Sequence, residues 1–298
     1  MRVNEHFELA FNAVWPSAGG SRGRTARVLP GFGLSLGITL LFVSLVLLLP
    51  MTSLVGQLAG LSLAEYWAII TEGRVVASYM ITIGAAAVAA IVNALFGLLM
   101  AWVLVRYEFP GRRLLDALMD LPFALPTAVA GITLATMYSS SGFMGRLLEP
   151  LGLEIAYTWV GIALAMAFTS IPFVVRTVQP VLEDLPGEVD EAAMTLGASD
   201  GLAFRRVILP HLWPALVTGT GLAFVRSLGE FGAVIFIAGN MPYETEITSL
   251  MIFVKLQEYD YVGASAIASV VLAVSLLLLL ALNLWQGRFI RRLHGGES

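Results

Sequence analysis

Two opposite charges lie inside an otherwise apolar stretch of the chain. Arg226 and Glu230 stand four residues apart in the sequence FVRSLGEFGAV, so on a helix they share one face and can form an ion pair. Charges inside a membrane are costly, and they usually mark a polar pathway or pair with one another. We interpret Arg226 and Ser227 as lining a pathway that attracts an anion, with Glu230 weakening that attraction enough for release. An ion pair that only packs the helices together is the open alternative.

Two prolines mark a second candidate segment of such a pathway. Pro122 and Pro126 lie four residues apart in LPFALPTAVAG, and each removes a backbone N–H donor from a helix. The carbonyl groups left without a donor are tolerated in a membrane only where protein or a water-filled cavity satisfies them. We therefore interpret Pro126 and Thr127 as pathway residues, with a purely structural kink as the open alternative.

The longest polar interruption between apolar stretches is residues 186–214, PGEVDEAAMTLGASDGLAFRRVILPHLWP. Its local signals predict two short helices joined by a tight corner. Pro186 suits a first helical turn, Gly197 can adopt the left-handed conformation that ends it, and Ser199 can cap the second helix. Pro210 is expected to end that second helix. The corner presents one acidic and two small side chains to a partner: Glu191, Ala192 and Ala193.

Signals for an enzyme or a metal site are weak or missing. Residues 33–37 (GLSLG) match the nucleophile-elbow pattern, but they lie in an apolar stretch without a preceding strand and fit small-residue helix packing better. The sequence has no cysteine, and His6, His211 and His294 lie far apart, so we expect no metal site. No phosphate-binding Gly-x-x-x-x-Gly-Lys loop is present, so we expect no catalytic site and no cofactor in this chain.

Membrane helices must position these residues, because 58% of the 298 residues are hydrophobic and only 13% are charged. Six apolar stretches are each long enough to cross about 30 Å of hydrocarbon as a helix. Segments 142–153 and 246–258 are predicted to be short amphipathic helices that either receive an outer partner or simply lie at the membrane surface. We therefore expect an all-α, polytopic membrane protein with six transmembrane helices: 32–54, 79–105, 118–138, 157–175, 212–237 and 262–285.

The distribution of basic residues predicts the orientation of these helices. Nearly all arginines outside the apolar stretches fall on one side, and the other side holds only Arg74, Arg146 and Lys255. The positive-inside rule therefore places both termini and the loop 183–211 in the cytoplasm. The resulting organisation is a cytoplasmic N-terminal segment (1–30, an interfacial helix or a tail), a six-helix domain (31–287) and a cytoplasmic tail (288–298).

The loop resembles the EAA loop of bacterial ABC-importer permeases, in which Glu-Ala-Ala is followed after three residues by Gly and later by Ile-Leu-Pro. Residues 191–193, Gly197 and 208–210 match that signature in spacing and position. In that family the loop is the helix that docks on the ATPase subunit. A plain connector and a nucleic-acid-binding helix-turn-helix are the alternatives, and the acidic first helix disfavours nucleic acid. The resemblance implies coupling roles for six residues: Glu191, Ala192, Ala193, Gly197, Leu209 and Pro210.

Longer segments are similar to sulfate/thiosulfate permeases of the CysT (CysU) type within that family. They are RYEFPGRRLLDALMDLPFALPTAVAG, TWVGIALAMAFTSIPFVVRTVQPVLEDL, RSLGEFGAVIFIAGN and TEITSLMIFVKLQEYDY. The resemblance implies a type I ABC importer permease fold in a bacterial inner membrane, with this chain forming half of a sulfate or thiosulfate pathway. Besides membrane lipid, the implied partners are a CysW-type permease, two CysA-type ATPases that bind ATP and Mg, and a periplasmic sulfate- or thiosulfate-binding protein. A stand-alone anion channel, an ion-coupled carrier and a molybdate permease are the alternatives.

Overall fold

The computed structural model describes residues 32–187, 192–193 and 195–294, with residues 288–294 described by their backbone alone. The expected N-terminal segment 1–30 and Glu191 therefore lie outside the described residues. Every regular element assigned within these ranges is a helix, which confirms the all-α class expected from the sequence. The chain divides into two compact units, residues 1–53 and 54–298.

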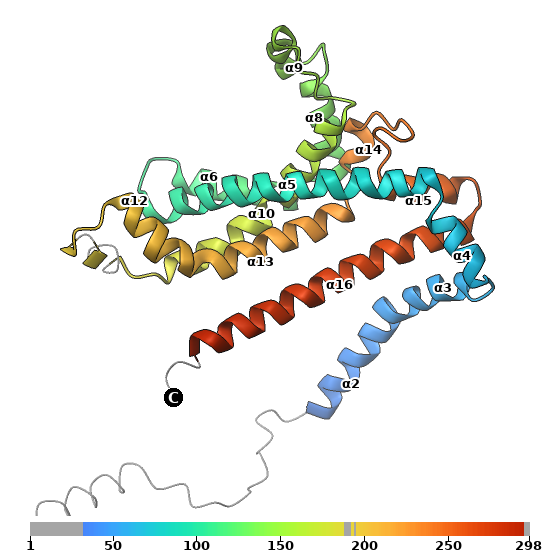
Figure 1. The fold of residues 1–298 in the computed structure, drawn as a ribbon, viewed down its shortest axis with the longest axis horizontal. Helices are drawn as coiled ribbons and strands as arrows, with labels where there is room; N and C mark the ends of the chain where they lie inside the picture. Colours follow the sequence, from blue (N-terminus) through green and yellow to red (C-terminus); the bar gives the residue numbers. More distant parts are fainter. Residues whose placement is uncertain (1–31, 188–191, 194, 295–298) are drawn as a thin grey trace, which may run out of the picture. The chain divides into compact units, whose positions relative to one another are not determined.

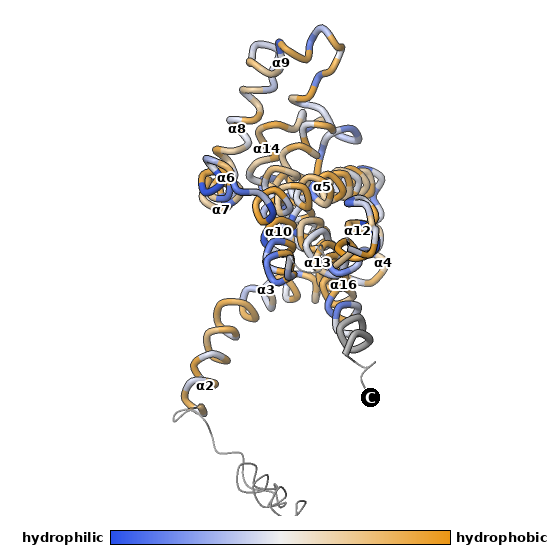
Figure 2. The backbone as a smooth tube through the Cα atoms, turned by 90° about the vertical axis from the view of Figure 1, so that its left-hand side faces the viewer, coloured by the Kyte–Doolittle hydropathy of each residue, from blue (hydrophilic) through white to orange (hydrophobic). Residues whose placement is uncertain are grey.

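The described part of the first unit is an apolar helix. α2 (Phe32–Val43) continues through a π-helical turn, η1 (Ser44–Leu48), into α3 (Leu49–Leu58), which runs on into the second unit. Most residues of this helix are hydrophobic (Figure 2), and none of them is buried. A helix that is apolar all round suits a lipid environment, in agreement with the expected span 32–54.

Three helices form the core of the second unit. α5 (Gly73–Arg106), α10 (Trp159–Glu183) and α13 (Leu209–Leu228) run side by side and contact one another along their lengths (Figure 1). Small side chains on α5 let the neighbouring helices approach closely. Four of them are almost completely buried: Ala85, Ala86, Ala89 and Ala90.

Three more helices pack around this core. α16 (Tyr261–His294) packs against α13 and against α15 (Thr248–Gln257), which lies within the predicted amphipathic segment 246–258. α4 (Leu63–Ile70) packs against α16. α4 begins at a capping box, in which the Ser62 side chain and backbone bond the Glu65 carboxylate and so lower the pKa of Glu65.

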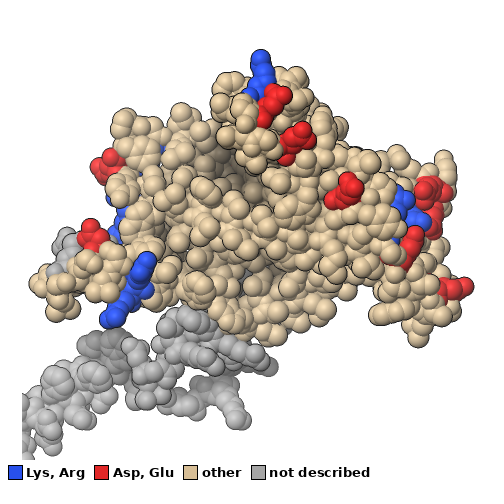
Figure 3. Space-filling model, turned by 45° about the horizontal axis from the view of Figure 1, so that its top comes forward, with Lys and Arg blue, Asp and Glu red and all other residues tan. Residues whose placement is uncertain are grey.

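The charge distribution fits a protein that spans a membrane. On the face drawn in Figure 3, Lys, Arg, Asp and Glu gather at the ends of the long helices and on the projecting segment near α9, and a broad uncharged surface lies between them. Among the described residues, five helices are long and apolar enough to cross a membrane: Phe32–Leu58, Gly73–Arg106, Trp159–Glu183, Asp200–Leu228 and Tyr261–Gly287.

The expected third span, 118–138, is not one helix. It is divided into the end of α6 (Arg112–Met119), the short α7 (Leu121–Ala124) and α8 (Thr127–Tyr138). The break falls at Leu125, whose extended backbone (φ −84°, ψ 135°) is the conformation that a following proline favours. The described chain therefore contains five continuous helices of spanning length where the sequence predicted six.

The expected fifth span, 212–237, is also interrupted. α13 ends at Leu228, residues 229–233 are irregular, and α14 (Val234–Ile237) follows. The amphipathic segment predicted at 142–153 contains α9 (Phe143–Leu148) and a 3₁₀ turn, η2 (Glu149–Leu151), which confirms its helical character.

The expectation that Pro210 ends the second loop helix is wrong. α12 (Asp200–Ala203) continues through a π-helical turn, η3 (Phe204–Ile208), directly into α13. Pro210 lies in the first turn of α13, just after the wider hydrogen-bond spacing of the π turn. A proline inside a helix removes one hydrogen bond and can bend the helix without ending it, so the chain continues as a helix beyond Pro210.

Candidate functional site

The two helix breaks lie against one another. α8 begins at Thr127, directly after the break at Leu125 and Pro126, and α8 packs on α14, directly after the break at residues 229–233. A Cβ atom added at Gly232 would collide with Thr127 Oγ1, and one added at Gly131 would collide with the Ala233 carbonyl oxygen. Glycine is therefore required on each side of this contact. Interrupted helices that meet in this way build the ion sites of many transporters.

The predicted ion pair closes the end of α13 at the same place. Arg226 Nη1 lies 2.8 Å from Glu230 Oε2, and the Glu230 side chain is only 1% exposed, whereas that of Arg226 is 35% exposed. The second carboxylate oxygen of Glu230 accepts a hydrogen bond from the Ala233 backbone N–H (3.0 Å). The Glu230 carbonyl accepts one from Ser249 Oγ on α15 (2.7 Å). Glu230 thus holds the irregular segment in place and leaves part of the Arg226 side chain accessible.

Ser227 has a different environment from its neighbour Arg226. Its side chain is completely buried, and its hydroxyl donates to the Ala223 carbonyl (2.8 Å) and lies 3.2 Å from Ser170 Oγ on α10. Asn93 on α5 donates to the same Ser170 hydroxyl (2.8 Å). The Ser227 hydroxyl therefore belongs to a polar link that joins α5, α10 and α13 inside the bundle.

The two candidate pathway residues of the other break are more accessible. Pro126 is exposed and Thr127 is half-buried, with its hydroxyl next to Gly232. The Pro126 carbonyl accepts the first amide bonds of α8, from Val129 (2.9 Å) and Ala130 (3.1 Å). The two preceding amides stand at the helix N-terminus, where helices carry unpaired donors. The structure thus brings Thr127 and Pro126 to the irregular segment 229–233, which contains Glu230 and follows Arg226.

The expected corner of the polar loop is present. Gly197 has a left-handed backbone (φ +86°), as its position predicted. The Leu196 amide bonds the Ala192 carbonyl (3.1 Å) and the Ala198 amide bonds the Ala193 carbonyl (3.0 Å), which closes the end of the first helix. Ser199 has the extended conformation of a cap, although its side chain makes no capping bond.

The exposed residues of this loop include three of the expected partner contacts. Ala192, Gly197 and Pro210 are exposed, whereas Ala193 and Leu209 are half-buried. The first helix thus offers small side chains at its accessible surface, and Glu191 lies outside the described residues.

Aromatic contacts pack the second loop helix (α12 and η3) against the bundle. The Trp102 and Phe204 rings pack edge to face at 5.3 Å between centroids, and the Arg106 guanidinium lies 5.7 Å from the Trp102 ring centroid. Nearby Ile208 and Leu212 are buried in one apolar cluster with Val178 of α10. A displacement of the loop would therefore also displace α5 and α10, in addition to α13.

One polar cluster, centred on Arg176, was not predicted from the sequence. Arg176 contributed only to the predicted orientation of the helices. A usable signal was present, because Asp116 and Asp120 stand four residues apart in LLDALMDL and so share a helix face.

Among the described residues, no group of three His, Cys, Asp or Glu side chains is arranged to hold a metal ion.

Comparison with known proteins adds independent information. The sequence pattern of the family described as "Binding-protein-dependent transport system inner membrane component" matches residues 93–295. The chain is 65% identical to the "Sulfate transport system permease protein CysT" of Salmonella typhimurium and to that of Escherichia coli K12, over 90% of this chain and 97% of each relative. A "Probable sulfate transport system permease protein cysT" of Nephroselmis olivacea is 51% identical over 83% of this chain and 87% of that protein.

Solved structures show the same fold at low sequence identity. A chain of a bacterial ABC transporter involved in the import of the acidic polysaccharide alginate superposes with a TM-score of 0.69 at 19% identity, covering 86% of this chain and 94% of that chain. A bacterial alginate ABC transporter in complex with an alginate pentasaccharide-bound periplasmic protein gives a TM-score of 0.70 at 19% identity with the same coverage. These matches confirm the importer permease fold, and the relatives found are transport permeases rather than enzymes.

Proposed function

We infer the function from the family: this chain belongs to the binding-protein-dependent transport system inner membrane components, and is a multi-pass membrane protein of an ABC importer. We propose that it is the permease subunit of a sulfate/thiosulfate importer and forms half of the translocation pathway. The 65% identity to two sulfate permeases over nine-tenths of the chain carries this proposal. The interrupted helices at Pro126 and residues 229–233 support it, since they place a partly exposed arginine beside a contact between two helix breaks.

The proposed assembly contains further subunits. This chain pairs with a CysW-type permease, two CysA-type ATPases bind ATP and Mg, and a periplasmic sulfate- or thiosulfate-binding protein delivers the anion. The fold shared with an alginate importer that was crystallised with its periplasmic protein supports a binding protein as partner. The assembly lies in a bacterial inner membrane, and the distribution of arginines supports cytoplasmic termini.

Coupling to ATP hydrolysis is assigned to the 183–211 loop. Ala192, Ala193 and Gly197, together with Glu191, Leu209 and Pro210, form the surface that docks on the ATPase. Movement of this surface reaches the bundle through the continuous helix from α12 to α13 and through the contact between Phe204 and Trp102. The helices then expose the anion site to one side of the membrane at a time.

The anion site itself is assigned to the meeting point of the two breaks. The exposed part of the Arg226 guanidinium attracts the anion, and the buried Glu230 carboxylate limits the strength of that attraction so that the anion can leave. Thr127, at the start of α8, and Pro126, directly before it, line the same place. Ser227 supports Arg226 from inside the bundle, because its hydroxyl is already bonded there.

Uptake by the reconstituted complex tests the proposed function. Proteoliposomes that contain both permeases and the ATPase are supplied with binding protein, radiolabelled sulfate and internal ATP. We expect uptake that requires ATP and is reduced by unlabelled thiosulfate more than by molybdate. Uptake that persists without ATP or without the ATPase would instead identify a channel or an ion-coupled carrier, and stronger competition by molybdate would identify a molybdate permease.

A further inference from the structure

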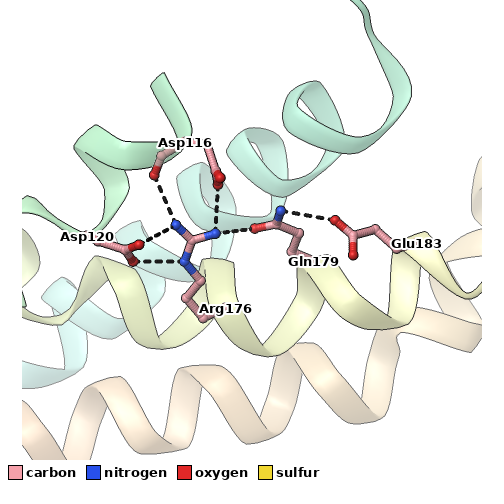
Figure 4. A network of polar contacts seen from close by, with 5 residues as sticks. All are labelled: Asp116, Asp120, Arg176, Gln179 and Glu183. Carbon is pink, nitrogen blue, oxygen red and sulfur yellow. Dashed lines mark hydrogen bonds and ion pairs between the residues drawn. The ribbon is translucent and has the colours of Figure 1, made fainter. Parts of the chain in front are cut away.

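The Arg176 side chain, near the cytoplasmic end of α10 in the predicted orientation, uses every hydrogen that it can donate (Figure 4). Nε and Nη2 grip the Asp120 carboxylate at 2.8 and 2.6 Å. Nη1 donates to Asp116 Oδ1 and to Gln179 Oε1, both at 2.7 Å, and Nη2 also donates to the Asp116 carbonyl (2.9 Å). Gln179 in turn donates to Glu183 (3.1 Å). A guanidinium has five N–H donors, and all five have a partner here.

This saturation decides what Arg176 can do. An arginine beside the path of an anion would ordinarily be a candidate binding site for it. Arg176 has no donor left for an anion, and its two nearest ionised neighbours, Asp116 and Asp120, would repel one. Its function is therefore to hold protein segments together.

The segments that Arg176 joins lie directly before a helix break. Asp116 is on α6 and Asp120 stands between α6 and α7, so the cluster fastens both short helices to α10. An apolar contact adds to it, because the rings of Phe123 on α7 and Phe173 on α10 pack edge to face at 5.4 Å between centroids. Three residues beyond Phe123 is Pro126, where the proposed anion site begins.

We propose that the Arg176 cluster is a permanent joint, which makes α6 and α7 move with α10 as one body throughout transport. The joint fixes the position of the break at Leu125, and thereby the position of Thr127 opposite Gly232. Arg176 is a positioning residue, since it does not touch the anion. This inference rests on the proposed transport function and adds to it the part of the permease that stays rigid.

Substitution of Arg176 by lysine tests the joint. Lysine keeps the positive charge but cannot grip a carboxylate with a planar fork, so we expect the maximal rate of ATP-dependent sulfate uptake to fall by about tenfold. The concentration of loaded binding protein that gives half-maximal uptake stays unchanged, because the outer docking surface is untouched. Arg113→Lys, at an exposed position of α6, is the matched control and keeps the wild-type rate. A wild-type rate for Arg176→Lys, or an equal loss for Arg113→Lys, overturns the proposal.

A cross-link separates a permanent joint from a gate. The chain has no cysteine, so Phe123→Cys combined with Phe173→Cys introduces its only two thiols. A short bifunctional thiol reagent then ties α7 to α10 in the assembled complex, and the same sample after reductive cleavage is the control. We expect equal uptake before and after cleavage, and uptake restored only by cleavage would show that the helices separate. Absence of ATP-dependent uptake by the wild-type complex would refute the proposed function itself. Failure of the joint alone would leave wild-type uptake intact and affect only the cross-linked complex.

Discussion

Arg226 and Arg176 are two arginines on neighbouring core helices with opposite use of their donors. Arg226 pairs with a single buried carboxylate, Glu230, and 35% of its side chain is exposed, close to the 31% of Arg176. Arg176 faces two carboxylates, a side-chain amide and a backbone carbonyl, and no donor is left over. The unequal number of partners assigns the two residues to different tasks. An arginine with spare capacity can exchange partners with a passing anion, whereas a saturated one fixes the frame in which that exchange happens.

The largest effect is expected from Arg226→Ala. Removal of the guanidinium leaves the Glu230 carboxylate buried without its counter-charge, beside the proposed site of a divalent anion. Uptake of sulfate by the reconstituted complex should fall by about 100-fold or more, while ATP hydrolysis stimulated by the loaded binding protein continues.

Glu230→Gln combined with Arg226→Ala is the control for that loss. The double substitution removes the uncompensated charge but does not restore the attraction for the anion. We therefore expect it to restore assembly of the complex without restoring uptake. Full uptake by Arg226→Ala would remove Arg226 from the pathway and would make the difference between the two arginines a matter of packing alone.

A smaller effect, on different observables, is expected from Gly197→Val. The left-handed backbone at Gly197 (φ +86°) costs a β-branched residue about 1–3 kcal/mol, and so the loop corner should be displaced from the ATPase. We expect uptake and stimulated ATP hydrolysis to fall together, by about tenfold. This pattern contrasts with that of Arg226→Ala, which loses uptake alone.

Gly201→Val is the matched control for the corner. Gly201 lies in α12 of the same loop, and no atom stands within 4 Å of where its Cβ would be. Intact uptake and intact ATPase stimulation in Gly197→Val would show that the corner does not couple the subunits.

Features that depend on neighbours along the chain could be predicted from the sequence. The apolar stretches located the long helices, and the position of Gly197 after a helical segment predicted its left-handed backbone. The prolines of LPFALPTAVAG indicated an interruption, although they did not show that Leu125 would end a helix completely. Pro210 was expected to end a helix, but a proline can also be accommodated inside a helix at the loss of one hydrogen bond, here directly after a π turn.

Features that depend on distant contacts could not be read from the sequence. Arg176 meets carboxylates 56 and 60 positions earlier in the chain, and nothing local indicates that α6 folds back onto α10. The contact between Thr127 and Gly232 likewise requires two breaks to coincide in space. Ser227 was grouped with Arg226 because the two are adjacent, yet successive helical residues point about 100° apart, and so one is buried while the other is accessible.

Arg226→Lys sharpens the comparison of the two arginines. A lysine ammonium is a point charge on a flexible stem, and a weak anion site needs charge more than it needs a planar fork. We expect uptake by Arg226→Lys to remain within about threefold of the wild type, against about tenfold lost in Arg176→Lys. Equal losses from the two lysine variants, measured side by side as maximal uptake rates, would mean that both arginines act through fork geometry.

The smallest effect is expected from Ser227→Ala, and it tests the boundary between pathway and interior. The substitution removes one buried hydroxyl, but Asn93 continues to donate to Ser170, so the link between α5 and α10 survives. A single buried hydrogen bond contributes about 1 kcal/mol to folding, so the variant should assemble normally and take up sulfate within about twofold of the wild type. Thr127→Val, next to Gly232 at the proposed site, is the contrasting variant and should lose more. A loss of uptake by Ser227→Ala, with an unchanged amount of assembled complex, would mean that the Ser227 hydroxyl of the wild type turns toward the anion during transport. The accessible surface of α13 would then include a residue that this structure buries.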